Sequence, residues 1–253
     1  DFTMTAGRMI GGTAQSGGCA YFGGNNQVNI TGGQFTGGVS NAGGGGNIRM
    51  YGSASYTAAN FNMSGAAIRG GRVEVTGTGG GNISLSSGTT RISNPYIEGG
   101  YAAAYGGNVS TGTAANITFT DCIIEGGYAA AQSGNVHMSS TNTTTAWTNC
   151  QFLNGSGTYG GNLSSGNGNN TITGGQILFG TARTTYGGNL NTSAGNTNAS
   201  NFTRLMADEN GNAPLIAGGS AKTYGGNLYM SGVTDLQAAR LINGKAVTSG
   251  KDL

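Results

Sequence analysis

The residues best placed for chemistry are two glutamates at matching positions in neighbouring copies of a sequence repeat. Glu98 lies in YIEGGYAAAYGGNV, and Glu125 lies in the following copy, IIEGGYAAAQSGNV. If the copies stack as parallel strands, the two carboxylates lie about 4.8 Å apart. A pair at that spacing can act as an acid–base couple, as in retaining glycosidases, or bind a cation.

The same glutamates have a structural interpretation. Arg69 occupies the matching position one copy earlier, and Asn154 occupies it one copy later. An ion pair between Arg69 and Glu98 on neighbouring strands would leave Glu125 in solvent. No further acid shares this position, and Asp121 is the only other acid close in sequence. The sequence therefore assigns no catalytic residue, and both interpretations stay open.

His137 is the only histidine, so the sequence has no Cys/His cluster for zinc. No aspartate or serine nucleophile is aligned with it to form a triad. It alternates with apolar neighbours, and we expect a surface imidazole. The glycine-rich run from Gly43 to Asn47 lacks the Lys-Ser/Thr of a phosphate-binding loop, and calcium-binding nonapeptide repeats need an aspartate in each turn. We predict no metal and no cofactor.

Two of the three cysteines share a position in the repeat. Cys122 and Cys150 each lie five residues before a recurring glycine, where most other copies hold Gly or Ala. They can therefore serve as compact apolar side chains. Neighbouring parallel strands also bring Cα atoms within disulfide range, so a bridge in an oxidising compartment stays open. Cys19 has no aligned mate and would be free or link two subunits.

An internal repeat of about 27 residues sets all these positions. Glycine runs lead into an asparagine eight times, in steps of 26 or 27 residues from Asn82 to Asn189. An Asn amide can bond the Asn of the turns above and below, and Asn tolerates a left-handed backbone. We therefore predict a buried amide ladder formed by Asn25, Asn47, Asn82, Asn108, Asn135, Asn162, Asn189 and Asn227.

Each copy also carries two strand-like patterns. After the asparagine, apolar, polar and apolar residues alternate, which indicates a strand with one buried face. A second apolar residue stands three positions before a recurring glycine, except where the segment before Gly211 departs. The recurring glycines are Gly12, Gly38, Gly71, Gly100, Gly127, Gly155, Gly180, Gly211 and Gly244. Dense glycine and β-branched residues exclude helix, and the alanine runs 102–104 and 129–131 are expected to be short linkers.

An aromatic column stands three positions before the asparagines, with Gln132 as an interruption. Its members are Phe22, Tyr105, Tyr159, Tyr186 and Tyr224. Stacked rings would contribute about 0.5–1.5 kcal/mol per pair. A sugar-binding platform is the alternative use of the same column.

These patterns predict an all-β fold, a parallel β-helix (solenoid) of about nine coils with about 27 residues each. We expect a single domain over residues 1–253, with more divergent coils at 204–253. The runs IIEGGYAAAQSGNV and WTNCQFLNGSGTYGGNL resemble right-handed parallel β-helix repeats. They are similar to the Gly-Gly-Ala-Ile and Phe-x-x-Asn repeats of polymorphic outer-membrane and adhesin-type proteins, and more distantly to the pectate-lyase-like helix. The resemblance implies an extracellular or cell-surface protein whose relatives include adhesins and carbohydrate-active enzymes.

Composition narrows the choice of partners. The chain has 11 basic and 9 acidic residues and a net charge of +2, which indicates neither nucleic acid nor an anionic membrane as partner. No stretch approaches the roughly 20 apolar residues that cross a bilayer. Open solenoid ends expose strand edges, so we expect a homo-oligomer or polymer.

The sequence thus favours a non-enzymatic extracellular structural subunit that self-associates into a filament, sheath or surface appendage. An adhesin or glycan-binding rod, whether a passenger domain or a phage-type fibre, is the first alternative. A polysaccharide lyase or hydrolase that uses Glu98 and Glu125 is the second.

Overall fold

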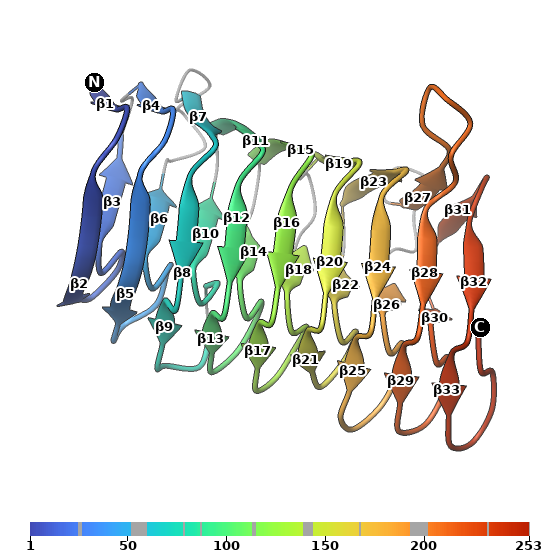
Figure 1. The fold of residues 1–253 in the computed structure, drawn as a ribbon. Helices are drawn as coiled ribbons and strands as arrows, with labels where there is room; N and C mark the ends of the chain where they lie inside the picture. The colour runs from blue at the N-terminus through green and yellow to red at the C-terminus, as the bar shows by residue number, and fades with distance from the viewer. Residues whose placement is uncertain are drawn as a thin grey trace.

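The computed structural model describes residues 1–24, 27–51, 60–77, 79–86, 88–112, 115–138, 144–166, 168–192, 202–231 and 233–252. These residues form strands and turns without any helix, and the strands wind into a parallel β-solenoid of about eight turns with about 28 residues per turn (Figure 1). The all-β solenoid predicted from the repeats is confirmed. About nine coils were expected. The chain crosses one sheet nine times and another only eight times, so it completes about eight turns. No described helix is long and apolar enough to span a bilayer.

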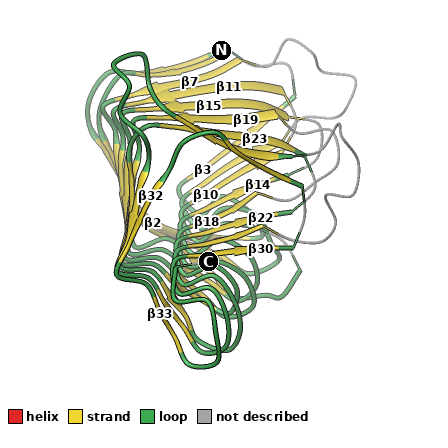
Figure 2. Ribbon diagram, turned by 90° about the vertical axis from the view of Figure 1, so that its right-hand side faces the viewer, coloured by secondary structure: helices red, strands yellow, loops and turns green. Residues whose placement is uncertain are grey.

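Three sheets run along the solenoid and enclose its core (Figure 2). Sheet A contains β1 (Phe2–Met4), β4 (Val28–Ile30), β7 (Asn60–Ser64), β11 (Gly88–Ser93), β15 (Ala115–Thr120), β19 (Thr144–Thr148), β23 (Asn169–Thr173), β27 (Thr203–Met206) and β31 (Thr234–Leu236). Sheet C contains β3 (Ala20–Gly23), β6 (Ile48–Tyr51), β10 (Ile83–Ser86), β14 (Val109–Thr111), β18 (Val136–Met138), β22 (Leu163–Ser165), β26 (Leu190–Thr192) and β30 (Leu228–Met230).

Sheet B has two parts that meet at β5. The first part contains β2 (Arg8–Ala14), β5 (Gln34–Ser40), β8 (Ala67–Arg69), β12 (Tyr96–Glu98), β16 (Ile123–Glu125), β20 (Gln151–Leu153), β24 (Gln176–Leu178), β28 (Leu215–Ala217) and β32 (Arg240–Ile242). The second part contains β9 (Arg72–Val73), β13 (Tyr101–Ala102), β17 (Tyr128–Ala129), β21 (Ser156–Gly157), β25 (Thr181–Ala182), β29 (Ser220–Ala221) and β33 (Lys245–Ala246). Of the alanine runs expected to be linkers, only the first residue of each, Ala102 and Ala129, belongs to a short strand.

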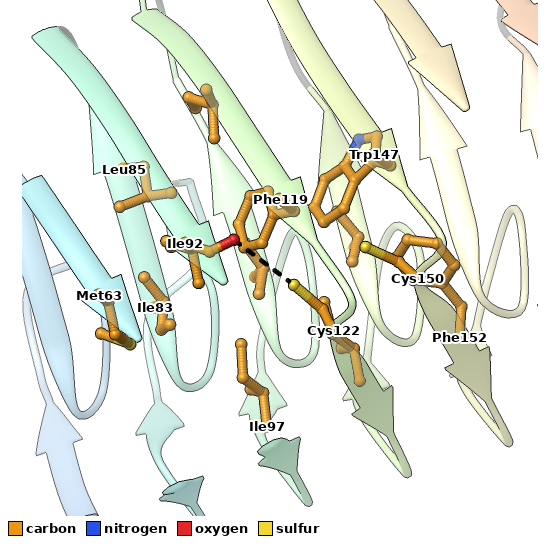
Figure 3. Packing of buried hydrophobic residues seen from close by; sticks show 14 of the residues in the cluster. Met63, Ile83, Leu85, Ile92, Ile97, Phe119, Cys122, Trp147, Cys150 and Phe152 are labelled. Atoms are coloured by element: carbon orange, nitrogen blue, oxygen red, sulfur yellow. Dashed lines mark hydrogen bonds between the residues drawn. The ribbon is translucent and has the colours of Figure 1, made fainter. Parts of the chain in front are cut away.

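Matching apolar side chains stack along the core because equivalent strands pair in register. On sheet B the predicted apolar position holds Phe35, Ile68, Ile97, Ile124, Phe152 and Ile177, all fully buried. Sheet A supplies the bulkiest pair, Phe119 and Trp147, whose rings stack 4.0 Å apart, with Phe152 edge-on to Trp147 at 5.2 Å (Figure 3). Stacking of this kind fixes the register of the turns.

The register differs from the predicted one in two coils. In the coil near residue 211, Ile216 takes the apolar position and Gly219 takes the glycine position. The shift arises because residues 207–214 form an additional loop between β27 and β28. In the first coil, Ala20 pairs with Ile48 and Phe22 pairs with Met50. Val28 therefore lies in β4 of sheet A, where it pairs with Phe61, and not in the strand that follows a ladder asparagine.

Candidate functional site

Seven asparagines form a continuous ladder along one corner of the solenoid. Nδ2 of each residue donates to Oδ1 of the next at 2.7–2.8 Å, in the order Asn47, Asn82, Asn108, Asn135, Asn162, Asn189 and Asn227. All seven are 0% exposed. The predicted ladder is confirmed for these residues.

Each amide in the middle of the ladder makes four hydrogen bonds, as Asn135 shows. Its Oδ1 accepts from Asn108 Nδ2 and from the Gly127 N–H. Its Nδ2 donates to Asn162 Oδ1 and to the Leu153 carbonyl. Every donor and acceptor of the side chain is therefore used, which removes the penalty of burying a polar group.

Residues other than asparagine stand at the two outermost positions of the ladder. Cys19 directly precedes Ala20, which pairs with Ile48, so it lies opposite Asn47. Its N–H donates to the Asn47 carbonyl at 3.0 Å, and its Sγ donates to Asn47 Oδ1 at 3.2 Å. Asn227 Nδ2 donates to Asp252 Oδ1 at 2.8 Å, and a carboxylate has no donor to continue the chain. Asn25, predicted as the first member, lies outside the described residues, and the register gives that position to Cys19.

The predicted acidic pair lies on the outer face of sheet B. Arg69, Glu98 and Glu125 occupy one register position of β8, β12 and β16. Arg69 Nε is 2.8 Å from Glu98 Oε1, which confirms the cross-strand ion pair. The Tyr96 hydroxyl lies 2.6 Å from Glu98 Oε2 and also contacts Glu125 Oε1. Glu125 is therefore held by a phenol, whereas the structural interpretation left it to solvent.

One phenol proton serves two carboxylates in this cluster. A hydroxyl carries a single proton, so Tyr96 donates to one glutamate at a time. Hydrogen bonds to Glu125 and then to Glu98 raise the pKa of Tyr96 above its ordinary value. A trough of about 460 Å³ runs past these carboxylates. Among the described residues no group of three or more His, Cys, Asp or Glu side chains could hold a metal. Glu98 and Glu125 line the trough, and a carboxylate has more acceptor sites than the contacts with Arg69 and Tyr96 use, so the cluster can also accept a hydrogen bond from a molecule there.

The predicted aromatic column is present in part. Tyr186 lies 6.3 Å from Tyr159 and stacks on Tyr224 at 5.8 Å. Tyr186 also stacks on Tyr229 at 4.3 Å. Phe22 is not a member, because its register places it opposite Met50 and its ring packs against Phe2 and Phe61. Tyr186 is therefore stacked with Tyr224 and Tyr229 beside sheet C, and the Tyr159 ring is tilted by 37° against it.

His137 is buried, which corrects the prediction of a surface imidazole. It is 7% exposed, because the Tyr105 ring stacks over it at 4.8 Å with an interplanar angle of 7°. Its Nδ1 lies 2.7 Å from Ser164 Oγ. Burial lowers the pKa of His137 to about 4, so the imidazole is neutral at pH 7. Tyrosines of the predicted column therefore cover an outer face that the alternating pattern had assigned to solvent.

A second aromatic stack, on the short strands of sheet B, escaped the sequence analysis. Tyr101 and Tyr128 share a register position, and their rings lie 5.6 Å apart at an angle of 3°. The Arg72 guanidinium lies 4.3 Å from the centre of the Tyr101 ring, and the Arg183 guanidinium lies 4.1 Å from that of Tyr128. The matching YAAA segments were the available signal. Each tyrosine therefore contacts the other ring and one guanidinium cation.

Cys122 and Cys150 lie on adjacent coils in the core as free thiols (Figure 3). Cys122 Sγ is 3.4 Å from the Thr120 carbonyl, and Cys150 Sγ is 3.4 Å from the Thr148 carbonyl. Burial raises the pKa of the Cys122 thiol above its ordinary value. This geometry fits the interpretation of both residues as compact apolar groups.

Comparisons with known proteins identify no relative. No family model matches the chain, and neither a curated protein nor a solved structure matches it. The likeness to adhesin-type repeats therefore stays a prediction, and the structure establishes a parallel β-solenoid with an asparagine ladder.

Proposed function

We propose that this protein is a structural rod subunit that assembles end to end with copies of itself on the outside of the cell. The observation that carries the proposal is the outermost edge of each sheet in the described chain. β1, β2 and β3 form one set of edges, and β30, β31, β32 and β33 form the other. In the described chain each edge strand has a neighbouring strand on one side only, although the Leu228 N–H of β30 also donates to the Asp252 carbonyl. These edges present backbone N–H and C=O groups to another chain.

The two sets of edges match in direction. All described strand pairs are parallel, so joining the last turn of one copy to the first turn of another continues the existing pattern. A head-to-tail contact of this kind does not close on itself and generates an open filament. Each added copy would extend the same three sheets.

Apolar side chains accompany these edges. Leu236 continues the core position of Leu205 on sheet A, yet it is 42% exposed because no described strand covers it. Val247 is 81% exposed in the last turn, and Ile10 is 64% exposed in the first. Burying such side chains at a junction would contribute roughly 25 cal/mol per Å² of apolar area.

Size-exclusion chromatography with light scattering, followed by negative-stain imaging, tests the assembly. We expect filaments about as wide as one solenoid at micromolar concentration. Leu236→Lys places a charge at the edge of sheet A and should leave monomers. Thr118→Lys is the matched control, because Thr118 is exposed in the middle of the same sheet. A wild-type protein that remains monomeric would overturn the proposal.

The glutamate cluster has a structural role in this proposal, since Arg69 and Tyr96 occupy its carboxylates. Turnover of an acidic polysaccharide that disappears in Glu98→Gln or Glu125→Gln would instead favour the lyase or hydrolase alternative.

Exposed aromatic rings favour a glycan-binding rod as the second candidate. Tyr224, for example, is 38% exposed and stacks on Tyr186. Glycan binding that drops in Tyr224→Ala would support that alternative.

A further inference from the structure

The tyrosine cover of sheet C is interrupted beside β6 and β10. The position three residues before a ladder asparagine holds Tyr105, Tyr159, Tyr186 and Tyr224, with Gln132 between the first two. It holds Gly44 and Gly79 in the two coils that precede Tyr105. Both glycines have positive φ, 107° and 110°. A Cβ on Gly79 would lie 1.9 Å from the Gly44 carbonyl oxygen. Close backbone packing therefore requires glycine at position 79 and excludes a ring there.

A groove of about 260 Å³ remains where the rings are missing. Tyr51 and Tyr105 line it, together with Arg49 and the hydroxyls of Ser84 and Ser110. The space is smaller than the 300–1,000 Å³ of typical ligand pockets, so it suits one small ring.

The covered part of sheet C shows how a ring would lie in this groove. Tyr105 stacks on His137, which is the outward residue of the following coil. The same offset applied to position 79 places a ring over Ser110, because Ser110 and His137 share a register position. A ligand ring there would occupy the place that tyrosine takes in later coils.

Arg49 brings an unneutralised positive charge to the groove. Its guanidinium donates from Nη1 to Ser84 Oγ at 2.8 Å and lies 5.3 Å from the centre of the Tyr51 ring. All nine acidic side chains belong to described residues, and the ion pairs among them use Arg69, Arg72 and Arg204. Arg49 therefore has no carboxylate partner.

This arrangement is unusual because Arg49 is partly buried. Burial lowers the pKa of its guanidinium, since the charged form loses solvation. Buried charges are normally paired, and a guanidinium fork matches a carboxylate in two parallel hydrogen bonds. The same groove therefore offers an arginine without a carboxylate partner and a space without the tyrosine ring of later coils.

We propose that this groove binds a small ring-bearing carboxylate. The carboxylate pairs with Arg49, and the ring lies over Ser110 between Tyr51 and Tyr105. A carboxylated sugar and an aromatic acid share this chemistry, and the two sources are separated by the probes used below. The site differs from both the end-to-end contacts and the glutamate trough.

Isothermal titration calorimetry at low ionic strength tests the site with four probes. Glucuronate and benzoate each carry a ring and a carboxylate, glucose carries only the ring, and acetate carries only the carboxylate. We expect at least one ring-bearing acid to bind at least tenfold more tightly than glucose and acetate. The stronger of the two acids identifies the source. If neither acid binds at millimolar concentration, or if glucose binds equally well, the proposal is wrong.

Variants locate the binding in the groove. Arg49→Gln should weaken binding of the acid at least tenfold, and Arg49→Lys should weaken it less, because the charge remains while the fork is lost. Ser110→Tyr should fill the ring position and abolish binding with Arg49 intact. Arg91→Gln is the matched control, since Arg91 is exposed on sheet A. Circular dichroism confirms folding of each variant. Unchanged affinity in folded Arg49→Gln would overturn the proposal, whatever the assembly state of the protein.

Discussion

Replacing Asn135 in the middle of the ladder tests whether the buried amides hold the turns together. Asn135→Ala removes two acceptor and two donor contacts at once. The Gly127 N–H, Asn108 Nδ2, Asn162 Oδ1 and the Leu153 carbonyl then lose a partner in a fully buried corner. Each unsatisfied buried group costs about 1–3 kcal/mol. Because the neighbouring backbone can relax in part, we expect a total loss of about 3–5 kcal/mol.

A carboxylate at the same place separates hydrogen bonding from packing. Asn135→Asp keeps the shape and both accepted bonds, but it turns two donors into acceptors that face Asn162 Oδ1 and the Leu153 carbonyl. Burial should raise the folded-state pKa of the introduced carboxyl above its unfolded value of about 3.9. The destabilisation relative to wild type is therefore full above the folded-state pKa. It shrinks as the pH falls through that value toward 3.9, since the protonated carboxyl can donate again.

Urea denaturation followed by circular dichroism measures these differences at pH 7 and pH 4. Asp252→Asn makes the opposite substitution at the end of the ladder. No further amide of the described chain lies beyond this position to accept a hydrogen bond, so the change in stability should be less than about 1 kcal/mol. Asn29→Ala is the surface control, because Asn29 is exposed. A loss below about 1 kcal/mol for Asn135→Ala would refute the reasoning, since four unpaired buried groups cannot be that inexpensive.

Three further predictions concern single positions. Gly127→Ala should cost at least about 3 kcal/mol in urea denaturation, because the new Cβ would lie 2.2 Å from the Gly134 carbonyl oxygen; a fully stable variant would contradict the close packing. Phe179 has φ of 57° and is 58% exposed, where the same turn of the next coil has Gly218, so Phe179→Asn should stabilise the fold by about 0.5–1 kcal/mol, and a lower melting temperature would count against backbone strain. His137 has a folded-state pKa near 4 against 6.5 for the free side chain, so its contribution is complete above pH 6.5 and falls by up to about 3 kcal/mol as the pH drops to about 4; the pH dependence of unfolding should flatten in His137→Gln and not in a surface control.

The repeat predicted the main features of the fold because glycine and asparagine act locally. Gly100 lies within hydrogen-bond distance of Asn108 through its N–H, and the same pair recurs as Gly127 with Asn135. Any chain that repeats such a pair at about 27 residues must bring the pairs into register if it coils. The core position of Ile97 and Ile124 followed from the same spacing.

The errors lie where contacts between turns decide the outcome. Cys19 takes a ladder position that no asparagine motif marks, because pairing of β3 with β6 sets the register. Gly219, and not Gly211, takes the glycine position because the additional loop at residues 207–214 shifts the following strand along the sequence. The burial of His137 depends on the ring of Tyr105 in the preceding coil, and the alternating pattern of one strand contains no information about that cover.

The arrangement of the candidate sites was only partly visible in the sequence. Glu98 and Glu125 were brought together by register alone, but the Tyr96 hydroxyl between them was not foreseen. The groove beside Arg49 was missed because it arises from two absent rings, at Gly44 and Gly79, and from the lack of any nearby acid. An absence of this kind shows only when the coils are superposed.

The identical bonding of successive ladder amides has a consequence for how such a protein can change in length. Asn108 and Asn135 each accept a hydrogen bond from the ladder amide of the preceding turn and donate one to the ladder amide of the following turn. Their bonding is therefore the same whichever turn they occupy. Tandem duplication of the segment between them would insert a complete turn, about 4.8 Å thick, whose two faces already fit their new neighbours. Unequal recombination within the gene could therefore lengthen or shorten the protein in whole turns without creating a new kind of interface.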